Sequence, residues 1–284
     1  MLRRVVMVAA LLAWLAPIAS AETVDEVIAK YIQGRGGMDK IKACQSMKAT
    51  GKMVMGGGAM EAPFVQFKRR PTDSRTEFTI QGLTGVQAFD GKSTTACGVM
   101  PFMGKKEPEA SPPEETKLMA EEADFDGPLV GWKEKGHQVE LMGKEQVEGA
   151  DAWKLKLTRK NGNVDYIYLD VETGLEVKNE SKRIVRGTEV ECEALFSDYK
   201  EVAGMQFPFT IAAGQKGAPA EQRRKIVMEK IELDVAMADS LFAMPPTAAR
   251  PDSAKAAAKP AEGKPAVAKP AESKPPGEAA KKKK

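Results

Sequence analysis

The single histidine, His137, is the first residue to consider for metal chemistry, because imidazole is a common zinc ligand. The nearest second ligand is Glu140, at His-x-x-Glu spacing. On a strand, positions i and i+3 point to opposite faces, so these two side chains do not converge. We therefore expect no metal site.

A second motif with chemical potential is Asp90-Gly91-Lys92-Ser93, which resembles the end of a phosphate-binding loop. Such a loop needs a glycine at position 86, where Val86 stands, and it opens a helix. Here the context is strand, turn and strand. We interpret the motif as a hairpin turn, since Asp-Gly between apolar runs is typical of one.

Signatures of catalysis are also missing elsewhere. No serine lies in a Gly-x-Ser-x-Gly motif. The acidic cluster Glu121, Glu122, Asp124 and Asp126 lacks calcium-loop spacing, and we interpret it as the solvated end of a helix. We therefore predict a binding protein that is not an enzyme and needs no cofactor. A hydrolase of lipid or glycan, with carboxylates that only the fold brings together, stays open as an alternative.

Three cysteines, Cys44, Cys97 and Cys192, are too far apart in the sequence for a CxxC redox pair or a zinc knuckle. One disulfide plus one thiol, or buried thiols alone, both fit an exported protein. The pairing is left open.

The amino terminus predicts export. Arg3 and Arg4 precede an apolar run from Val5 to Ala19, and Ala19-Ser20-Ala21 has the small-x-small pattern that signal peptidase requires. We expect a signal peptide over 1–21, cleavage after Ala21 and a periplasmic protein. An uncleaved membrane anchor is the alternative, although about fifteen apolar residues are short for a span.

The carboxyl-terminal segment, 247–284, has a different composition from the rest. Lys-Pro dipeptides recur every five residues, and ten basic residues face four acidic ones. Such a segment buries no core, so we expect a disordered basic tail that acts as a spacer or contacts an anionic membrane surface. Because the whole chain carries only +3, the body at 22–246 is mildly acidic, which argues against nucleic-acid binding.

The predicted elements of the body are few helices and many strands. Thr23 and Glu26 form a capping box that opens an amphipathic helix, and Met38 to Ala43 indicates a short second one. Ser111-Pro112-Pro113-Glu114 caps a further helix, after a loop expected over Gly104 to Pro113. Strands are expected to resume near Leu129.

The strands are joined by turns too short for crossover helices, so the sheet must be antiparallel. Asn161-Gly162 is one such hairpin turn. We predict a mainly β (α+β) protein of about ten or eleven strands. So many strands must curl into a barrel or half-barrel, or split into a sandwich, with the helices covering the open side.

Four segments together resemble the periplasmic lipoprotein carrier superfamily, the outer-membrane lipoprotein-sorting proteins. They are Phe67-Lys68-Arg69-Arg70-Pro71 with Ser74-Arg75-Thr76-Glu77-Phe78, the turn Phe89-Asp90-Gly91-Lys92, the late strands at 199–208, and the closing segment at 241–246. The chain departs from the pattern at Thr94-Thr95-Ala96-Cys97, where carriers tend to have aromatic residues, and in its basic tail.

The resemblance implies an unclosed antiparallel barrel whose helical lid covers a hydrophobic cavity for lipoprotein acyl chains or lipid. It also implies an inner-membrane ABC-type releasing complex and an outer-membrane acceptor as partners. In such carriers the arginine before the proline latches the lid by hydrogen bonds to backbone carbonyls, and Arg70 is the matching residue. A solvated charge in a basic turn is the alternative for Arg70.

We predict that alternate strand residues line the cavity, with either strand face open as the lining one. The candidates are Met53, Met55, Phe64, Phe78, Ile80, Trp153, Leu155 and Leu157. Each buried methylene contributes about 0.8 kcal/mol, so an apolar concavity binds acyl chains without many polar contacts. The rival hypothesis is an envelope protein-interaction or sensor module of the same fold without lipid cargo.

Overall fold

The computed structural model describes residues 22–93, 95–185 and 188–243, without the side chains of residues 184 and 185. The predicted signal peptide and basic tail lie outside these residues, so both stay predictions. No helix of the described part is long and apolar enough to cross a membrane.

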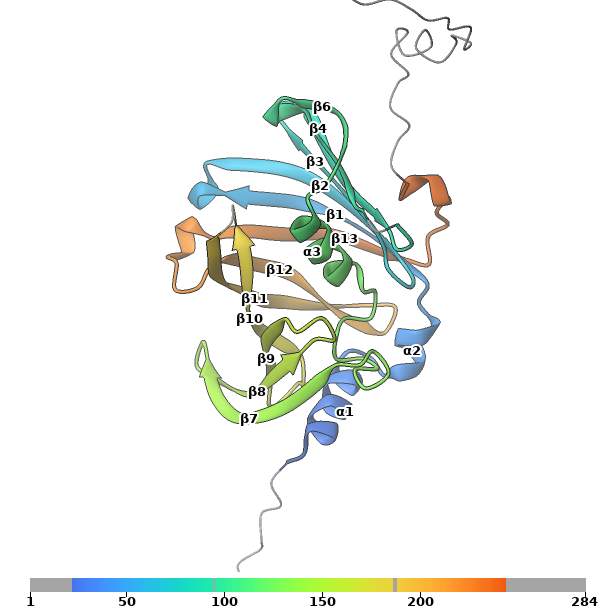
Figure 1. The fold of residues 1–284 in the computed structure, drawn as a ribbon. Coiled ribbons are helices and arrows are strands. Elements are labelled where there is room, and N and C mark those ends of the chain that lie inside the picture. The colour runs from blue at the N-terminus through green and yellow to red at the C-terminus, as the bar shows by residue number, and fades with distance from the viewer. Residues whose placement is uncertain (1–21, 94, 186–187, 244–284) are drawn as a thin grey trace, which may run out of the picture. The chain divides into compact units, whose positions relative to one another are not determined.

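Three α-helices and thirteen strands make up the described fold (Figure 1). The helices are α1 (Val24–Gly34), α2 (Met38–Ala43) and α3 (Pro113–Ala123). The first strands are β1 (Ser46–Met55), β2 (Met60–Arg69), β3 (Asp73–Ile80), β4 (Leu83–Asp90), β5 (Cys97–Met100) and β6 (Lys105–Ala110). The others are β7 (Gln138–Val147), β8 (Ala150–Thr158), β9 (Val164–Asp170), β10 (Glu176–Val185), β11 (Thr188–Val202), β12 (Met205–Gln215) and β13 (Arg224–Leu233).

All thirteen strands belong to one antiparallel sheet, in the order β6-β5-β4-β3-β2-β1-β13-β12-β11-β10-β9-β8-β7. Two meanders are joined where β1 pairs with β13. The sheet curves but does not close, because β6 and β7 are its two edges. The mainly β, half-barrel fold predicted from the sequence is therefore confirmed.

The strand count of ten or eleven was too low. The segment 104–113, expected to be a loop, contains β6, which pairs with β5. This strand was missed because of its charged residues and Pro108. Its outer edge pairs with no other strand of the described sheet, and charged residues and proline are typical of such edges. The prediction that strands resume near Leu129 is also wrong. Leu129 is a buried residue within a run of turns, and the next strand is β7.

Local chemistry explains the start of α1. The Thr23 backbone nitrogen donates to Glu26 Oε2 at 2.8 Å, and the Glu26 nitrogen donates to Thr23 Oγ1 at 3.3 Å, which completes the predicted capping box. The buried face of α1 consists of Val27, Ile28 and Tyr31. Each such side chain contributes roughly 2 kcal/mol when it leaves water, so packing holds this helix to the sheet.

The connection from β6 to β7 joins the two sheet edges and carries α3, so it must cross the open side of the curve. In Figure 1, α3 lies in front of the sheet and α1 packs beside the β7–β9 end. We call the covered side the concave face. Strand register places Phe64 opposite Phe78, and these residues share this face with Phe89, against which α3 packs.

The main core lies at the β7–β9 end of the concave face. It joins α1, α2 and the turns around Leu129 to Leu155 and Ile167. At the middle of the sheet, Gly51 on β1 permits a close approach: a Cβ there would lie 2.1 Å from the Val227 carbonyl oxygen. Phe64 packs over this glycine and is only 6% exposed.

Candidate functional site

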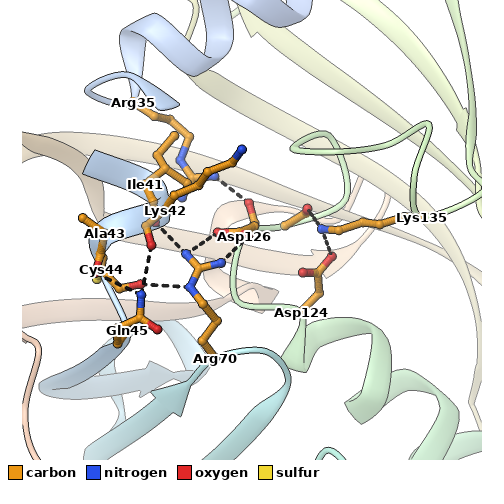
Figure 2. A network of polar contacts seen from close by, with 11 residues as sticks. Arg35, Ile41, Lys42, Ala43, Cys44, Gln45, Arg70, Asp124, Asp126 and Lys135 are labelled. Atoms are coloured by element: carbon orange, nitrogen blue, oxygen red, sulfur yellow. Dashed lines mark hydrogen bonds and ion pairs between the residues drawn. The ribbon is translucent and has the colours of Figure 1, made fainter. Parts of the chain in front are cut away.

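Arg70, at the end of β2, contacts two chain segments at once (Figure 2). Its Nε donates to the Cys44 carbonyl oxygen at 3.0 Å, and its Nη2 donates to the Ile41 carbonyl oxygen at 2.6 Å. These are orphan carbonyls at the end of α2, which a cation satisfies both by hydrogen bonding and by its charge. Arg70 thus contacts helix carbonyls, whereas its role as a lid latch stays a prediction.

The second segment that Arg70 contacts is the turn after α3. Asp126 accepts two parallel hydrogen bonds, from Nη1 at 2.5 Å and from Nη2 at 2.8 Å. The Phe125 ring lies 4.9 Å from the guanidinium carbon. The two charged side chains are about a fifth exposed, 21% and 18%, so water screens this ion pair only in part. Arg70 therefore joins α2 to the α3 connection through one planar group.

Neighbouring cations fix the same turn from other directions. Arg35 Nη1, at the end of α1, donates to the Asp126 carbonyl oxygen at 2.7 Å and to the Tyr31 hydroxyl at 3.1 Å. Lys135 Nζ donates to Asp124 Oδ2 at 2.6 Å and to the Gly127 carbonyl oxygen at 2.7 Å. The turn from Asp124 to Gly127 is thus the point where α1, α2 and α3 are linked (Figure 2).

The acidic cluster is therefore not the solvated end of a helix, as the sequence suggested. Asp124 and Asp126 are ion-paired, and the Glu121 side chain is 9% exposed and bonded to two asparagines. A cluster of acidic residues without a cation nearby in the sequence favours a solvated helix end. The cation that pairs with Asp126 is far away in the sequence, because Arg70 lies 56 positions before it.

All eight predicted cavity residues lie on the concave face, as the strand register shows. The fold does not bring them into one group. Trp153, Leu155 and Leu157, on β8, are at most 3% exposed and belong to the core with α1. In this conformation they contact the protein's own helix, and their role as a cavity wall stays a prediction.

The other five predicted residues form an apolar strip on β1, β2 and β3. Phe64 is buried, whereas Met53, Met55, Phe78 and Ile80 are only partly buried. The exposed Met60 and Leu83 extend the strip to its rim, because they pair with Met55 and Ile80. The helices leave this strip of the concave face incompletely covered.

A small cavity of about 170 Å³ lies behind the Arg70–Asp126 pair. Its apolar walls include Ile41, Met47 and Phe207, and Asp126 closes one side. The Arg70–Asp126 pair thus borders on apolar interior space. A movement of α2 or of the Asp126 turn would change this cavity.

One partly buried carboxyl has an unusual acidity. Burial raises the pKa of Glu176, on β10, to about 7, against a hydrogen bond from Asn179 and the charge of Arg35, which both lower it. The Tyr199 hydroxyl donates to the Glu176 carbonyl oxygen at 2.7 Å. The charge of Arg35 acts on this carboxyl without an ion pair or a hydrogen bond between the two side chains.

The structure defines the state of the three cysteines. All three cysteines are free thiols, which decides between the alternatives left open by the sequence. Burial raises the pKa of Cys44 and of Cys97, so neither is an activated nucleophile. No cluster of metal-binding side chains occurs among the residues that the structure describes.

Sequence reasoning missed Asp126 and Phe125 as partners of Arg70, and Arg35 as a second cation at the same turn. Arg70 was named because its arginine-proline turn matches that of the carrier family, and that turn is a local pattern. Asp126 offered only its place in an acidic cluster, and nothing in that cluster named the arginine that pairs with it.

Comparison with known proteins agrees with this architecture. No family model and no curated protein matches the sequence. A solved structure of a LolA superfamily protein from Nitrosomonas europaea matches with 13% identity over 78% of this chain and 98% of its own, at a TM-score of 0.53. A DUF1329 family protein from Desulfovibrio piger matches with 14% identity over the same shares, also at 0.53.

At this level of identity the likeness shows the fold. The protein has a LolA-like fold, and the resemblance to the lipoprotein carrier superfamily predicted from the sequence is confirmed at that level.

Proposed function

We propose that the protein is a periplasmic carrier that shelters the acyl chains of a lipoprotein or lipid against its concave face. The observation that carries this proposal is the apolar strip of Met53, Met55, Phe78 and Ile80, which the helices leave partly uncovered. Partly exposed apolar side chains inside a curve gain free energy when a hydrocarbon chain covers them.

The arrangement around Arg70 supports the carrier hypothesis. We propose that Arg70 acts as a latch, because it holds α2 and the α3 connection by hydrogen bonds that break without any covalent change. Opening would widen access to the strip and, with larger movement of α1, would uncover the β8 side chains. Non-enzymatic binding, transfer from an inner-membrane ABC-type complex and delivery to an outer-membrane acceptor follow from this hypothesis.

The test uses two neighbouring residues on opposite faces of β3. We expect Ile80→Asp to remove acyl species from the purified protein, because a carboxylate on the concave strip repels hydrocarbon. Thr79→Asp is the matched control, since Thr79 points to the other face and bonds the Thr84 hydroxyl at 3.0 Å. Native mass spectrometry and lipid extraction measure the bound species.

The carrier hypothesis is rejected if the wild-type protein holds no acyl species and takes up no fluorescent fatty acid. A tight protein partner in that case, with binding unaffected by Ile80→Asp, identifies the interaction or sensor module instead.

A further inference from the structure

A separate cavity of about 720 Å³ lies between α3, the Arg70 turn and the β8–β9 hairpin. Unlike the concave strip, it is lined by charged groups. Its basic side chains are Arg70, Lys117, Lys135, Arg159 and Lys160. Its acidic side chains are Glu121, Asp124 and Asp126, so the positive charges exceed the negative ones.

The carboxylates of the cavity do not pair with all of its basic side chains. Asp124 and Asp126 are already paired with Lys135 and Arg70. Lys117 and Lys160 have no carboxylate within ion-pair distance among the described residues. The Lys160 stem packs at Gly136, and Lys117 Nζ donates a long hydrogen bond to Asn163 Oδ1 at 3.4 Å. Two ammonium groups are therefore available to an anion.

Glu121 supplies a second and independent observation. Its Oε1 accepts hydrogen bonds from Asn161 and Asn163 at 2.6 Å each. Its Oε2 is buried and accepts no hydrogen bond from any described residue, and Arg159 Nε lies 3.7 Å away. A buried carboxylate oxygen without a donor is costly, so a ligand that donates a hydrogen bond here would relieve that cost.

His137 reports on the charge in the cavity. Its Nδ1 accepts a hydrogen bond from the Lys160 backbone nitrogen at 3.1 Å. Burial, followed by the positive charges of Arg159 and Lys135, lowers the pKa of this ring. An anion bound beside these cations would oppose their effect.

We propose that this cavity binds the headgroup of a lipid, with its phosphate at Lys117 and Lys160 and its amine at Glu121 Oε2. The assignment to a lipid rests on the proposed function, whereas the chemistry of the site, a phosphate with an adjacent amine, rests on the cavity alone. The Arg70 latch lines the same cavity, so a bound headgroup lies next to the group that holds the helices.

The experiment uses glycerophosphoethanolamine, which has the headgroup but no acyl chain, and inorganic phosphate as the second probe. Because His137 is the only histidine, a protein without a histidine tag gives one imidazole signal in NMR. We expect glycerophosphoethanolamine to raise the pKa of His137 by on the order of 0.5 units, and inorganic phosphate to bind more weakly.

Two variants separate the two halves of the site. The double change Lys117→Gln and Lys160→Gln should weaken glycerophosphoethanolamine at least tenfold, whereas Lys106→Gln with Lys225→Gln, on exposed strand positions, should leave it unchanged. Glu121→Gln should remove the preference for glycerophosphoethanolamine over phosphate. Circular dichroism checks that each variant is folded.

The proposal is overturned if neither probe shifts the His137 signal, or if phosphate binds as well as glycerophosphoethanolamine and Glu121→Gln changes nothing. Since the probe has no acyl chain, its binding tests this cavity only. A protein that binds the probe but no fatty acid retains the headgroup site and loses the carrier function, and the reverse result rejects the headgroup site alone.

Discussion

At the scale of single residues, Arg70 shows why a guanidinium is suited to this junction. It is planar, always charged and has five donors, of which Nε, Nη1 and Nη2 here reach two carbonyls and one carboxylate. A lysine has one ammonium and cannot present this fork. The joint between α2 and the α3 connection thus depends on one side chain and its carboxylate partner.

We expect Arg70→Leu to destabilise the protein by about 3 kcal/mol, because it leaves the Asp126 carboxylate and two carbonyl oxygens unpaired. Asp126→Asn should cost about 1–2 kcal/mol. The double variant should be more stable than the sum of the two losses predicts, by about 1–2 kcal/mol. Urea unfolding of the four proteins measures this coupling.

Arg224→Leu is the matched control for the arginine, since Arg224 is exposed at the start of β13. Its effect should stay within about 0.5 kcal/mol. Strictly additive losses at Arg70 and Asp126 would contradict a direct interaction between them.

Glu176 predicts a dependence of stability on pH. Its folded pKa of about 7 lies above the ordinary value of 4.5, mainly because the carboxyl is buried. The folded state therefore holds an extra proton in this range, and the stabilisation from this group is complete below about pH 4.5 and lost as the pH rises through 7.

We expect Glu176→Gln to remove this loss. The difference in unfolding free energy, variant minus wild type, should increase by on the order of 2 kcal/mol between pH 5 and pH 8. Urea unfolding at both pH values measures it. An equal difference at pH 5 and pH 8 would show that Glu176 titrates normally in the folded protein.

At the scale of elements, α1 and α3 are held differently. The helix α1 buries three large side chains and has a complete capping box. The helix α3 buries only Thr116 and Ala123, has no side-chain cap at Pro112, and ends without a basic residue in its last turn. Acidic residues at a helix carboxyl terminus oppose the helix dipole. The helix α3 is thus the weaker cover of the concave face.

We expect amide hydrogens of α3 to exchange at least tenfold faster than those of α1 in the native protein, because local opening follows the number of buried contacts. Arg70→Leu should accelerate exchange in α2 and α3 further. Hydrogen–deuterium exchange with mass spectrometry measures both effects. Equal hydrogen-exchange rates in α1 and α3 would argue against α3 as the mobile part of the proposed lid.

At the scale of the whole molecule, an unclosed sheet has to protect two edges. The edge strand β6 carries Lys105, Lys106, Glu107 and Glu109, and Pro108 in its middle has no N–H to offer another strand. These residues disfavour the pairing of a second strand with this edge of the open sheet.

We expect Pro108→Val together with Lys106→Val to promote association through β6, because the edge then offers a regular row of donors and an apolar surface. Light scattering should show a higher apparent mass than for the wild type, rising with concentration. Pro63→Val is the control, since Pro63 lies in β2, which has neighbours on both sides. An unchanged mass would show that β6 is protected by other means.

The sequence alone determined the local features of this protein. Alternation, the Asp-Gly and Asn-Gly turns and the capping box at Thr23 specify antiparallel strands and α1, since each depends on residues only a few positions apart. Arg70 was named through the resemblance to the carrier family, which rests in part on the short arginine-proline turn between two strands. Charged β6 was missed because an exposed edge strand lacks the alternation that marks a half-buried one.

Only the tertiary structure decided which strand face is concave and which distant charges meet there. Apolar residues occur on both faces of several strands, and the pairing of β1 with β13 sets the curve that makes one face inner. Asp126 joins Arg70, and Glu121 joins Arg159, because the connection between the two sheet edges must cross the open side. Such contacts depend on the path of the whole chain through the fold, which no local pattern encodes.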